Sequence, residues 1–521
     1  MKTILTVIFI VIVNILQAQY QNIKIGNYVS ANEPSIYINP NNTLQIMAGS
    51  NLNYWYYSED GGYSWASGTL VSQQYGVWGD PVIIADTAGD FYFFHLSNPQ
   101  VGSWIDRIVC QKFDKQTNTW SDGTFMGLNG TKAQDKHWAV VDKNTNAIYV
   151  TWTQFDNYGS GSSSCQSNIR FSKSLDGGET WSEAITINEI SGDCIDSDNT
   201  TEGAVPTIGP DGEIYVSWSG PAGIVFDRSL DGGETWLEND IFVTQQPGGW
   251  DIYIPGIARS NGMPITICDL SGGPNHGTIY INYADQSNGA NDTDVWLVKS
   301  TDGGNSWSEP IRVNDDPVGK HQFFTWMALD QSNGTLYFVF YDRRNHTGHE
   351  TDVYMAKSID GGSSFENFKI SESPFTPTES GYFFGDYNNI SAVNNTVRPI
   401  WTRRETNGTL SIYTAIVDMT VTIPEKTENM ISMEQNAPNP FVNYTIFSFR
   451  LMEKSEVKLG IFDALGRETV ILLDQTMEAG KHEVVFDNNT HHLAPGTYFF
   501  GLRSNDNVIQ RKMVVANKAK Y

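Results

Sequence analysis

Carboxyl, phenol and imidazole groups lie at the polar starts of several apolar, strand-like runs in this 521-residue chain. Two carboxyl groups beside a glycosidic bond can act as acid and base, and a tyrosine or histidine can assist them. Glu33 and Asp135 are two such residues. From the same positions and their neighbours we select as candidate catalytic residues Asp80, Glu202, Asp386, Tyr253 and His137.

Arginines near the ends of other runs are candidates for binding an anionic substrate, because a guanidinium forms two parallel hydrogen bonds to a carboxylate. Segments 283–304 and 341–362 align without a gap, yet Arg343 replaces Asp285, so the fold does not require this arginine. WTRRE (401–405) places Arg403 at the equivalent position of the next repeat. The candidate substrate-binding residues are Arg343, Arg403, Arg259 and His321. The alternative is that the arginines are solvated rim residues.

A repeated eight-residue turn indicates how the strands that carry these residues are arranged. SLDGGETW occurs at 174–181 and 229–236, with near-copies at 58–65, 300–307 and 358–365. Gly-Gly permits positive φ, the aspartate can accept hydrogen bonds from nearby amides, and the closing aromatic residue can be buried. We call these segments the Asp-box turns and expect a structural role for their aspartates, Asp60, Asp176, Asp231, Asp302 and Asp360.

Strand-like runs around these turns predict an all-β fold. Seven polar strand starts indicate seven four-stranded units, and a circular array of such units is a β-propeller. The N-terminal segment 22–27 can supply the last unit's missing strand. A six-bladed propeller is the alternative, because the unit near 254–285 is irregular. The Asp-box turns join third to fourth strands, so the candidate site residues belong at the opposite end of the sheets.

The Asp-box turns resemble those of the sialidase or BNR-repeat superfamily, over residues 19–420. The resemblance implies a carbohydrate-active propeller that hydrolyses acidic glycans in the manner of an exo-glycosidase, with Arg259, Arg343 and Arg403 as a carboxylate clamp. The Arg-Ile-Pro motif of sialidases is missing, since no arginine precedes Arg107. The turns also occur in lyases and non-catalytic propellers. A polysaccharide lyase and a non-catalytic glycan- or protein-binding surface propeller are therefore the alternatives.

A second module is expected at 433–521, after a linker at 421–432. Its alternating strands, separated by Gly, Pro and Asn turns, predict a small β-sandwich. NAPNPF, FDALGRE, LAPGTYFF and RKMVV resemble the C-terminal sorting domain of type IX secretion cargo. The resemblance implies a Bacteroidota source, the type IX secretion machinery as partner, and a secreted or outer-membrane-attached protein.

The remaining features concern export and cofactors. Residues 1–18 are a predicted signal peptide, with a membrane anchor as the alternative, and no later run is apolar enough to span a bilayer. A formal net charge of −26 excludes nucleic acid as a partner. An exported chain favours a disulfide between Cys165 and Cys194. We expect no cofactor; calcium at the acidic segment 192–198 is left open and unassigned.

Overall fold

The computed structural model describes residues 20–26, 28, 30–377, 383–418, 431–451, 454–463, 467–504 and 507–517. The chain divides into two units, residues 1–420 and 421–521, each of which is described by itself. The predicted signal peptide (1–18) lies outside the described residues, and so does the linker up to residue 430. Among the described residues, no helix is both long enough and apolar enough to cross a membrane.

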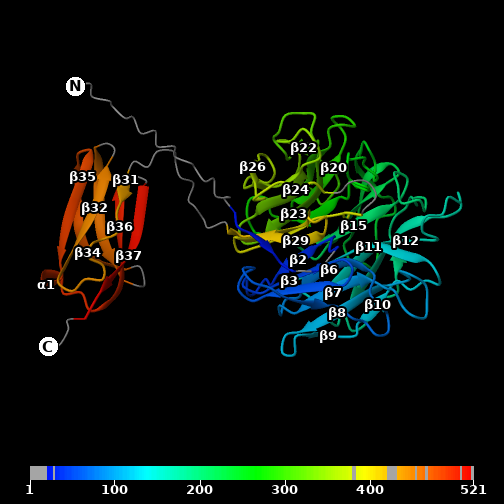
Figure 1. The fold of residues 1–521 in the computed structure, drawn as a ribbon, viewed down its shortest axis with the longest axis horizontal. Coiled ribbons are helices and arrows are strands. Elements are labelled where there is room, and N and C mark those ends of the chain that lie inside the picture. Colours follow the sequence, from blue (N-terminus) through cyan, green and yellow to red (C-terminus); the bar gives the residue numbers. More distant parts are fainter. Residues whose placement is uncertain are drawn as a thin grey trace, which may run out of the picture. The chain divides into compact units, whose positions relative to one another are not determined.

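The described part of the first unit contains seven antiparallel sheets (Figure 1). The first sheet contains β2 (Ser35–Ile38), β3 (Ile46–Ser50), β4 (Tyr54–Ser58) and β5 (Ala66–Thr69), and the second contains β6 (Gly79–Ala85), β7 (Phe91–Leu96), β8 (Ile108–Asp114), β9 (Thr119–Trp120) and β10 (Thr124–Met126). The third sheet contains β11 (Ala133–Val141), β12 (Ile148–Phe155), β13 (Ser167–Ser174) and β14 (Ile185–Thr186). The fourth contains β15 (Glu202–Ile208), β16 (Ile214–Gly220), β17 (Gly223–Ser229) and β18 (Ile241–Thr244).

The other three sheets complete this unit. The fifth sheet contains β19 (Ile265–Cys268), β20 (Ile279–Asp285), β21 (Asp294–Ser300) and β22 (Ile311–Arg312), and the sixth contains β23 (Gln322–Asp330), β24 (Thr335–Asp342), β25 (Asp352–Ser358) and β26 (Glu366–Lys369). The seventh contains β27 (Asn389–Val393), β28 (Thr396–Arg404), β29 (Leu410–Ala415) and β30 (Val417–Asp418), and the N-terminal strand β1 (Asn22–Lys24) joins this last sheet.

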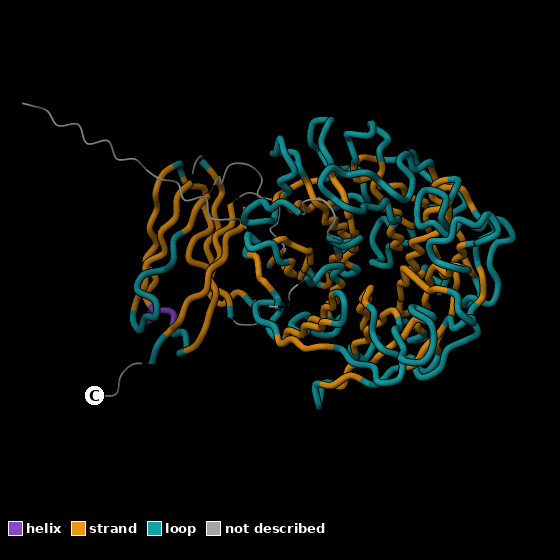
Figure 2. The backbone as a smooth tube through the Cα atoms, turned by 45° about the vertical axis from the view of Figure 1, so that its right-hand side comes forward, coloured by secondary structure: helices purple, strands orange, loops and turns teal. Residues whose placement is uncertain are grey.

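The sheets form a closed ring. The first strand of each sheet contacts the first strand of the next, and β27 of the last sheet contacts β2 of the first. β1 pairs with β29, so the two ends of this unit share one sheet. The strands lie around the ring in Figure 2 with loops between them. The prediction of an all-β propeller is confirmed, and a ring of this kind leaves few free sheet edges.

Packing on both faces explains why the strands are apolar almost throughout. Every residue of β6, β12, β15 and β23 is buried, because each sheet is covered by its neighbours in the ring. Trp152, Trp218 and Trp401, all on second strands, are at most 1% exposed. Burial of such large side chains contributes strongly to stability.

The Asp-box turns satisfy their own polar groups. In the turn after β13, Asp176 Oδ1 accepts from the Thr180 amide (2.9 Å) and Oδ2 accepts from the Thr180 hydroxyl (2.6 Å). The Ser174 hydroxyl oxygen accepts from the Gly178 amide (2.8 Å). Gly177 and Gly178 have φ of 71° and 84°, which side chains rarely adopt. The same bonds recur at Asp60, Asp231, Asp302 and Asp360.

We expect the stability of the propeller to fall as the pH is lowered from about 4 to about 2. Hydrogen bonds, first from the threonine or serine hydroxyl, lower the pKa of Asp176, Asp231, Asp302 and Asp360 to about 2. In that range the unfolded chain binds more protons than the folded one, so acid favours unfolding. Melting temperatures measured across this pH range test the effect. Asp176→Asn should reduce the slope, whereas Glu309→Gln, at an exposed position, should leave it unchanged.

The second unit is a β-sandwich, as predicted. One sheet contains β31 (Ile431–Met433), β32 (Tyr444–Leu451) and β35 (Gly480–Asp487), and the other contains β33 (Ser455–Phe462), β34 (Glu468–Met477), β36 (Gly496–Ser504) and β37 (Asn507–Val515). A short helix, α1 (Asn488–His491), follows β35. Phe447 of one sheet and Phe500 of the other have ring centroids 4.5 Å apart, so the sheets share a core. β31 begins two residues before the predicted module start.

Candidate functional site

A β-bulge recurs near the start of the first strands. The pairing of first and second strands shifts by one residue between Gly79 and Val82, and again between Asp135 and Trp138. Equivalent shifts occur in β15 and β23. The bulge gives Asp80 and Lys136 positive φ values of 53° and 46°. A bulge re-aims the side chain that it contains, and such backbone strain in residues other than glycine is typical of functional sites.

The bulges of β6 and β11 line a pocket at the end of the sheets opposite the Asp-box turns. The pocket has a volume of about 360 Å³ and we call it the mouth pocket. Its charged and aromatic lining residues are Glu33, Asp80, Asp135, Lys136, Arg259, Trp78, Trp104, Tyr158 and Phe383. A larger cavity of about 660 Å³ lies along the inner strands and reaches the Asp-box end, where Asp142, Lys143, His276 and Asp330 line it. The mouth pocket has more charged lining residues, five, and is the candidate site.

Lys136 is the buried cation of the mouth pocket. Its Nζ lies 3.0 Å from Asp80 Oδ2, 2.9 Å from Asp386 Oδ2 and 3.7 Å from Asp135 Oδ1. The Lys136 side chain is only 3% exposed. Burial alone would lower the pKa of Lys136, but the charges of Asp135, Asp386 and Asp80 outweigh burial and hold it well above its usual value. The lysine is therefore a permanent cation that brings three carboxylates together.

Arg259 extends this network toward the pocket wall. Its Nε donates to Asp386 Oδ1 (2.8 Å), its Nη2 donates to Asp386 Oδ2, and its Nη1 donates to Asp196 Oδ2 (2.9 Å). The Tyr158 hydroxyl donates to the same Asp196 oxygen (2.6 Å). One third of the Arg259 side chain remains exposed. Arg259 can therefore contact a ligand while it stays paired.

Asp386, predicted as an acid or base, is paired with two cations in the structure. Its side chain is fully buried and both oxygens accept from Arg259. Burial would raise the pKa of Asp386, but Arg259 and Lys136 outweigh burial and lower it. Asp386 is a charged anchor for the two cations.

Glu33 and Asp80 form a pair of neighbouring carboxyl groups with opposite pKa shifts. The Asn51 side chain links the Glu33 carboxyl group to the backbone of Asp80: its Nδ2 donates to Glu33 Oε2 and its Oδ1 accepts from the Asp80 backbone amide (2.7 Å). Burial, and then the charge of Asp80, raise the pKa of Glu33 well above its usual value. Burial opposes ionisation of Asp80, but Lys136 lowers its pKa. One group is thus suited to hold a proton at neutral pH and the other to stay ionised.

Asp135 adds a third carboxyl group to the mouth pocket. Burial, partly offset by Lys136, raises its pKa to about 7. Asp135 is therefore harder to ionise than an ordinary aspartate.

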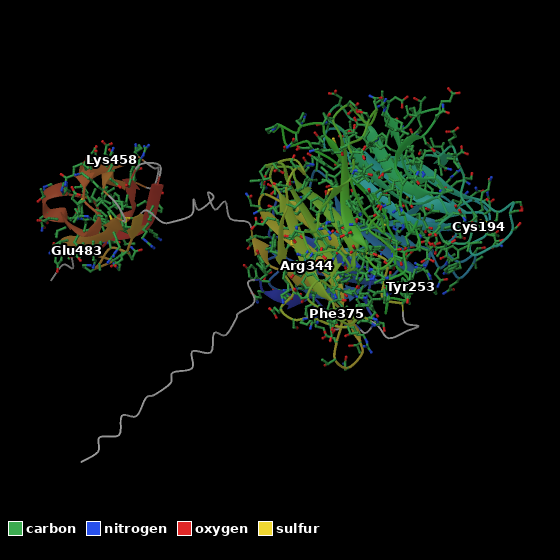
Figure 3. The ribbon with its side chains drawn as sticks, turned by 90° about the horizontal axis from the view of Figure 1, so that it is seen from above. Cys194, Tyr253, Arg344, Phe375, Lys458 and Glu483 are labelled. Carbon is green, nitrogen blue, oxygen red and sulfur yellow. A yellow bond between two sulfur atoms is a disulfide. The ribbon has the colours of Figure 1, made fainter. Side chains whose placement is uncertain are left out.

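Three other candidate catalytic residues do not line the mouth pocket. Glu202 is completely buried, and burial followed by the charges of Asp196 and Asp135 raises its pKa well above its usual value. Burial lowers the pKa of His137 to about 4, so its ring is neutral. Tyr253, labelled in Figure 3, is 72% exposed. Substrate in the pocket would reach none of these three directly.

The predicted clamp of three arginines is not formed, because only Arg259 lines the mouth pocket. Arg343 is 3% exposed, and its Nη1 donates to the Pro255 carbonyl (2.6 Å). Burial lowers its pKa to about 10. Arg403 donates to the Ser373 carbonyl (3.0 Å) and lies over the ring of Phe375, labelled in Figure 3.

His321 does not line the mouth pocket either. Its Nδ1 is bonded to the Thr293 hydroxyl at 3.0 Å. Burial, and then Arg343, lower its pKa to about 4.

Sequence reasoning missed four polar residues of the site: Lys136, Asn51, Tyr158 and Asp196. Asp135 and His137 were selected as polar residues at a strand start, and Lys136 between them was not; the pairing of β11 with β12 shifts at this point. The acidic segment 192–198 did contain a signal, since it holds Asp196. Asp196 accepts from Arg259, Tyr158 and Trp250. No cluster of three metal-ligating His, Cys, Asp or Glu residues is present in the described part of the chain.

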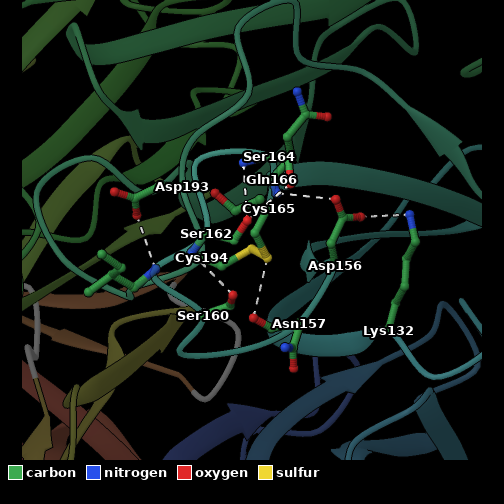
Figure 4. Close-up of a disulfide and its surroundings, with 12 residues drawn as sticks. Lys132, Asp156, Asn157, Ser160, Ser162, Ser164, Cys165, Gln166, Asp193 and Cys194 are labelled. Atoms are coloured by element: carbon green, nitrogen blue, oxygen red, sulfur yellow. Dashed lines mark hydrogen bonds and ion pairs between the residues drawn. A yellow bond between two sulfur atoms is a disulfide. The ribbon is translucent and has the colours of Figure 1, made fainter.

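A disulfide joins the two loops that carry Tyr158 and Asp196. Cys165 and Cys194 are bonded, with Cα atoms 5.7 Å apart, as expected from the sequence (Figure 4). The Gly159 amide also donates to the Cys194 carbonyl (2.7 Å). The cross-link therefore holds one wall of the mouth pocket in place.

Cys194→Ser is expected to loosen this wall locally. The sequence separation of 29 residues corresponds to about 3.6 kcal/mol of stabilisation in the chain-entropy description. Hydrogen exchange of the amides at 157–166 and 192–199 should become faster, while exchange in β23 and β24 stays unchanged. The double variant Cys165→Ser/Cys194→Ser should match the single variant, because either change removes the same bond. Unchanged exchange in both loops would contradict a positioning role.

Comparisons with known proteins match the second unit to a family. Residues 437–516 match the secretion system C-terminal sorting domain. No curated protein matches the chain. Among solved structures, the Hadza microbial sialidase Hz136 is 14% identical, covers 73% of this chain and 75% of its own, and has a TM-score of 0.41.

Two further solved structures have other activities. Penicillium chrysogenum α-L-arabinanase complexed with arabinobiose is 14% identical over 68% of this chain and 99% of its own, with a TM-score of 0.39. An ulvan lyase, a polysaccharide lyase, is 10% identical over 75% and 95%, with a TM-score of 0.44. Identities this low do not select one activity. The second unit belongs to the secretion system C-terminal sorting domain family, and it follows a β-propeller in the chain.

Proposed function

We propose that this protein is a secreted, carbohydrate-active propeller that hydrolyses glycosidic bonds in the mouth pocket. The observation that supports this most is that Glu33 and Asp80 line the same pocket with raised and lowered pKa values, and that Asn51 links the Glu33 carboxyl group to the Asp80 backbone. Glycosidases require one protonated and one ionised carboxyl group beside the bond that they cleave. Both residues line the mouth pocket, at whose inner wall Glu33 is 1% and Asp80 8% exposed.

In this proposal each pocket residue has one role. The protonated Glu33 carboxyl donates its proton to the leaving glycosidic oxygen. The ionised Asp80 attacks the anomeric carbon as the bond to the leaving oxygen breaks, and a water molecule then hydrolyses the glycosyl–Asp80 ester and returns a proton to Glu33. Lys136 keeps Asp80 ionised, and Arg259 binds an acidic group on the glycan through its exposed third. Asp386 and Asp196 orient Arg259.

A non-catalytic glycan-binding propeller is the second candidate. The observation that favours it is the pairing of Lys136 with Asp80, Asp135 and Asp386, which gives each of these three buried carboxylates a cation partner. A binding platform needs such a rigid pocket but no proton transfer. Polysaccharide lysis would differ from both functions by releasing unsaturated products.

The sorting domain supports export through the type IX secretion machinery, with residues 1–18 as the signal for the first membrane. We infer a Bacteroidota source and a location outside the cell or on its surface. Surface labelling of cells, with and without residues 433–521, tests this. Loss of the extracellular protein on truncation is expected, and unchanged export would contradict it.

Screening the full chain against sialosides, uronate-containing polysaccharides and neutral glycans tests the enzymatic proposal. New reducing ends with saturated products support hydrolysis, and unsaturated uronates indicate a lyase. Binding without any product supports the non-catalytic platform. Absence of both binding and turnover on all substrates would contradict a carbohydrate function.

A further inference from the structure

Aromatic side chains are exposed at the rim of the mouth pocket, in contrast to the buried tryptophans of the sheets. Trp78, Trp104 and Phe383 are 38%, 44% and 40% exposed, and all three line the pocket. Large apolar side chains that gather in solvent at a pocket rim indicate a binding surface. They come from different loops: Trp78 directly precedes β6, Trp104 lies between β7 and β8, and Phe383 lies between β26 and β27.

Trp78 and Trp104 contact each other at the rim, and we call this pair the platform. Their ring centroids are 5.8 Å apart and the ring planes are 89° to each other. Trp104 also contacts Tyr158 edge-on, with centroids 5.8 Å apart. Because the two indoles are perpendicular, their mutual contact uses a face of only one of them. Aromatic faces therefore remain available to a ligand.

The backbone holds the platform in place. The Trp78 amide donates to the Leu96 carbonyl (2.9 Å), and the Ile105 amide, next to Trp104, donates to the Ser97 carbonyl (3.0 Å). Both bonds attach the platform to the end of β7. A surface fixed in this way loses little conformational entropy when a ligand binds.

The chemistry of the rim fits a sugar ring. A pyranose has apolar C–H groups on its faces and hydroxyl groups around its edge. The negative face of an indole attracts the C–H groups, and nearby polar side chains can bind the hydroxyls. At the mouth pocket Asn51 and Arg259 are polar lining residues close to this rim. A purely apolar ligand would instead desolvate the exposed third of the Arg259 side chain without offering it a hydrogen bond.

We propose that Trp78 and Trp104 form a second sugar-binding site, which holds the unit next to the one at Glu33 and Asp80. This inference deepens the proposed function and rests on it for the placement of the first sugar. The ligand is then an oligosaccharide or polysaccharide chain that occupies pocket and platform together. A single terminal sugar fills the pocket alone.

Titration calorimetry on the full chain tests the platform without any need for turnover. The probes are sialyllactose, tetragalacturonate and cellotetraose. For whichever of these oligosaccharides binds, Trp78→Ala and Trp104→Ala should each raise the dissociation constant by about 10-fold to 100-fold. Trp78→Phe should recover most of the loss, since it retains an aromatic face. Tyr63→Ala, an exposed aromatic residue in an Asp-box turn, is the matched control and should not change binding.

A comparison of two ligand lengths distinguishes the contribution of the platform to binding from that of the mouth pocket. The monosaccharide of the probe that binds should be unaffected by Trp78→Ala, because it reaches only the pocket. Equal loss for both lengths, no loss for either, or no binding of any probe to the unchanged protein would overturn the platform. If Trp78→Ala weakens binding but no product ever forms, the platform stands and the proposed hydrolysis fails.

Discussion

Glu33→Gln is expected to lower kcat/KM for glycoside hydrolysis by about 10²-fold to 10⁴-fold, the range for loss of a general acid. Glutamine has the size of glutamate and can still accept the hydrogen bond from Asn51. It cannot give up a proton to the leaving oxygen. Steady-state kinetics on the substrate identified by screening measure the loss, and an unchanged melting temperature shows that the fold is intact.

The leaving group distinguishes acid catalysis from a structural effect. Substrates with a nitrophenyl leaving group need little protonation, so Glu33→Gln should affect them much less than natural glycosides. Activity of the unchanged protein should fall as the pH rises through the elevated pKa of Glu33, because the acid loses its proton. Glu309→Gln should retain full activity. Equal losses for both leaving groups would contradict the role of Glu33 as acid.

Lys136→Met is expected to destabilise the propeller by about 3–5 kcal/mol, the cost of removing one partner from a buried ion pair. Methionine has nearly the same length but leaves Asp80, Asp135 and Asp386 without their shared cation. Chemical denaturation of the full chain, followed through the unfolding of the first unit, measures the change. Lys24→Met, which removes an exposed pair with Glu405, should cost no more than about 1 kcal/mol.

The pH dependence of Lys136→Met has a definite sign. Without the lysine the pKa values of the three aspartates rise, so the folded variant binds protons more tightly than the unfolded chain. Its stability should therefore recover as the pH is lowered from neutral toward about 5. A destabilisation that is no larger than that of Lys24→Met, or that does not shrink in mild acid, would contradict the central role of Lys136.

The sequence predicted the repeating architecture because the interactions concerned are local. An Asp-box turn contains its own donors and acceptors within eight residues, so each copy marks one strand pair wherever it occurs. The strand β1 was predicted to close the last sheet, and it pairs with β29. The sorting domain was also predicted from short phrases, and a family match covers residues 437–516.

The site was only partly predictable, because it depends on side-chain direction and on loops from several sheets. The sequence placed Glu33, Asp80 and Arg259 at the correct end of the propeller, where they line one pocket. It could not show that a bulge turns Lys136 inward, since one inserted residue reverses strand alternation. It also placed Arg343 on the rim, whereas the structure buries it against the Pro255 carbonyl.

By itself, then, the sequence determined the class of fold, the end of the sheets at which the candidate site lies, and the sorting domain. Turns and strands could be predicted because both depend on residues that are neighbours in the chain. Only the tertiary structure decided which charges share one pocket. Asp386 and Arg259 are 127 residues apart in the chain and bond directly. Their pKa values and roles follow from burial and distance, and both quantities exist only once the ring of sheets has closed.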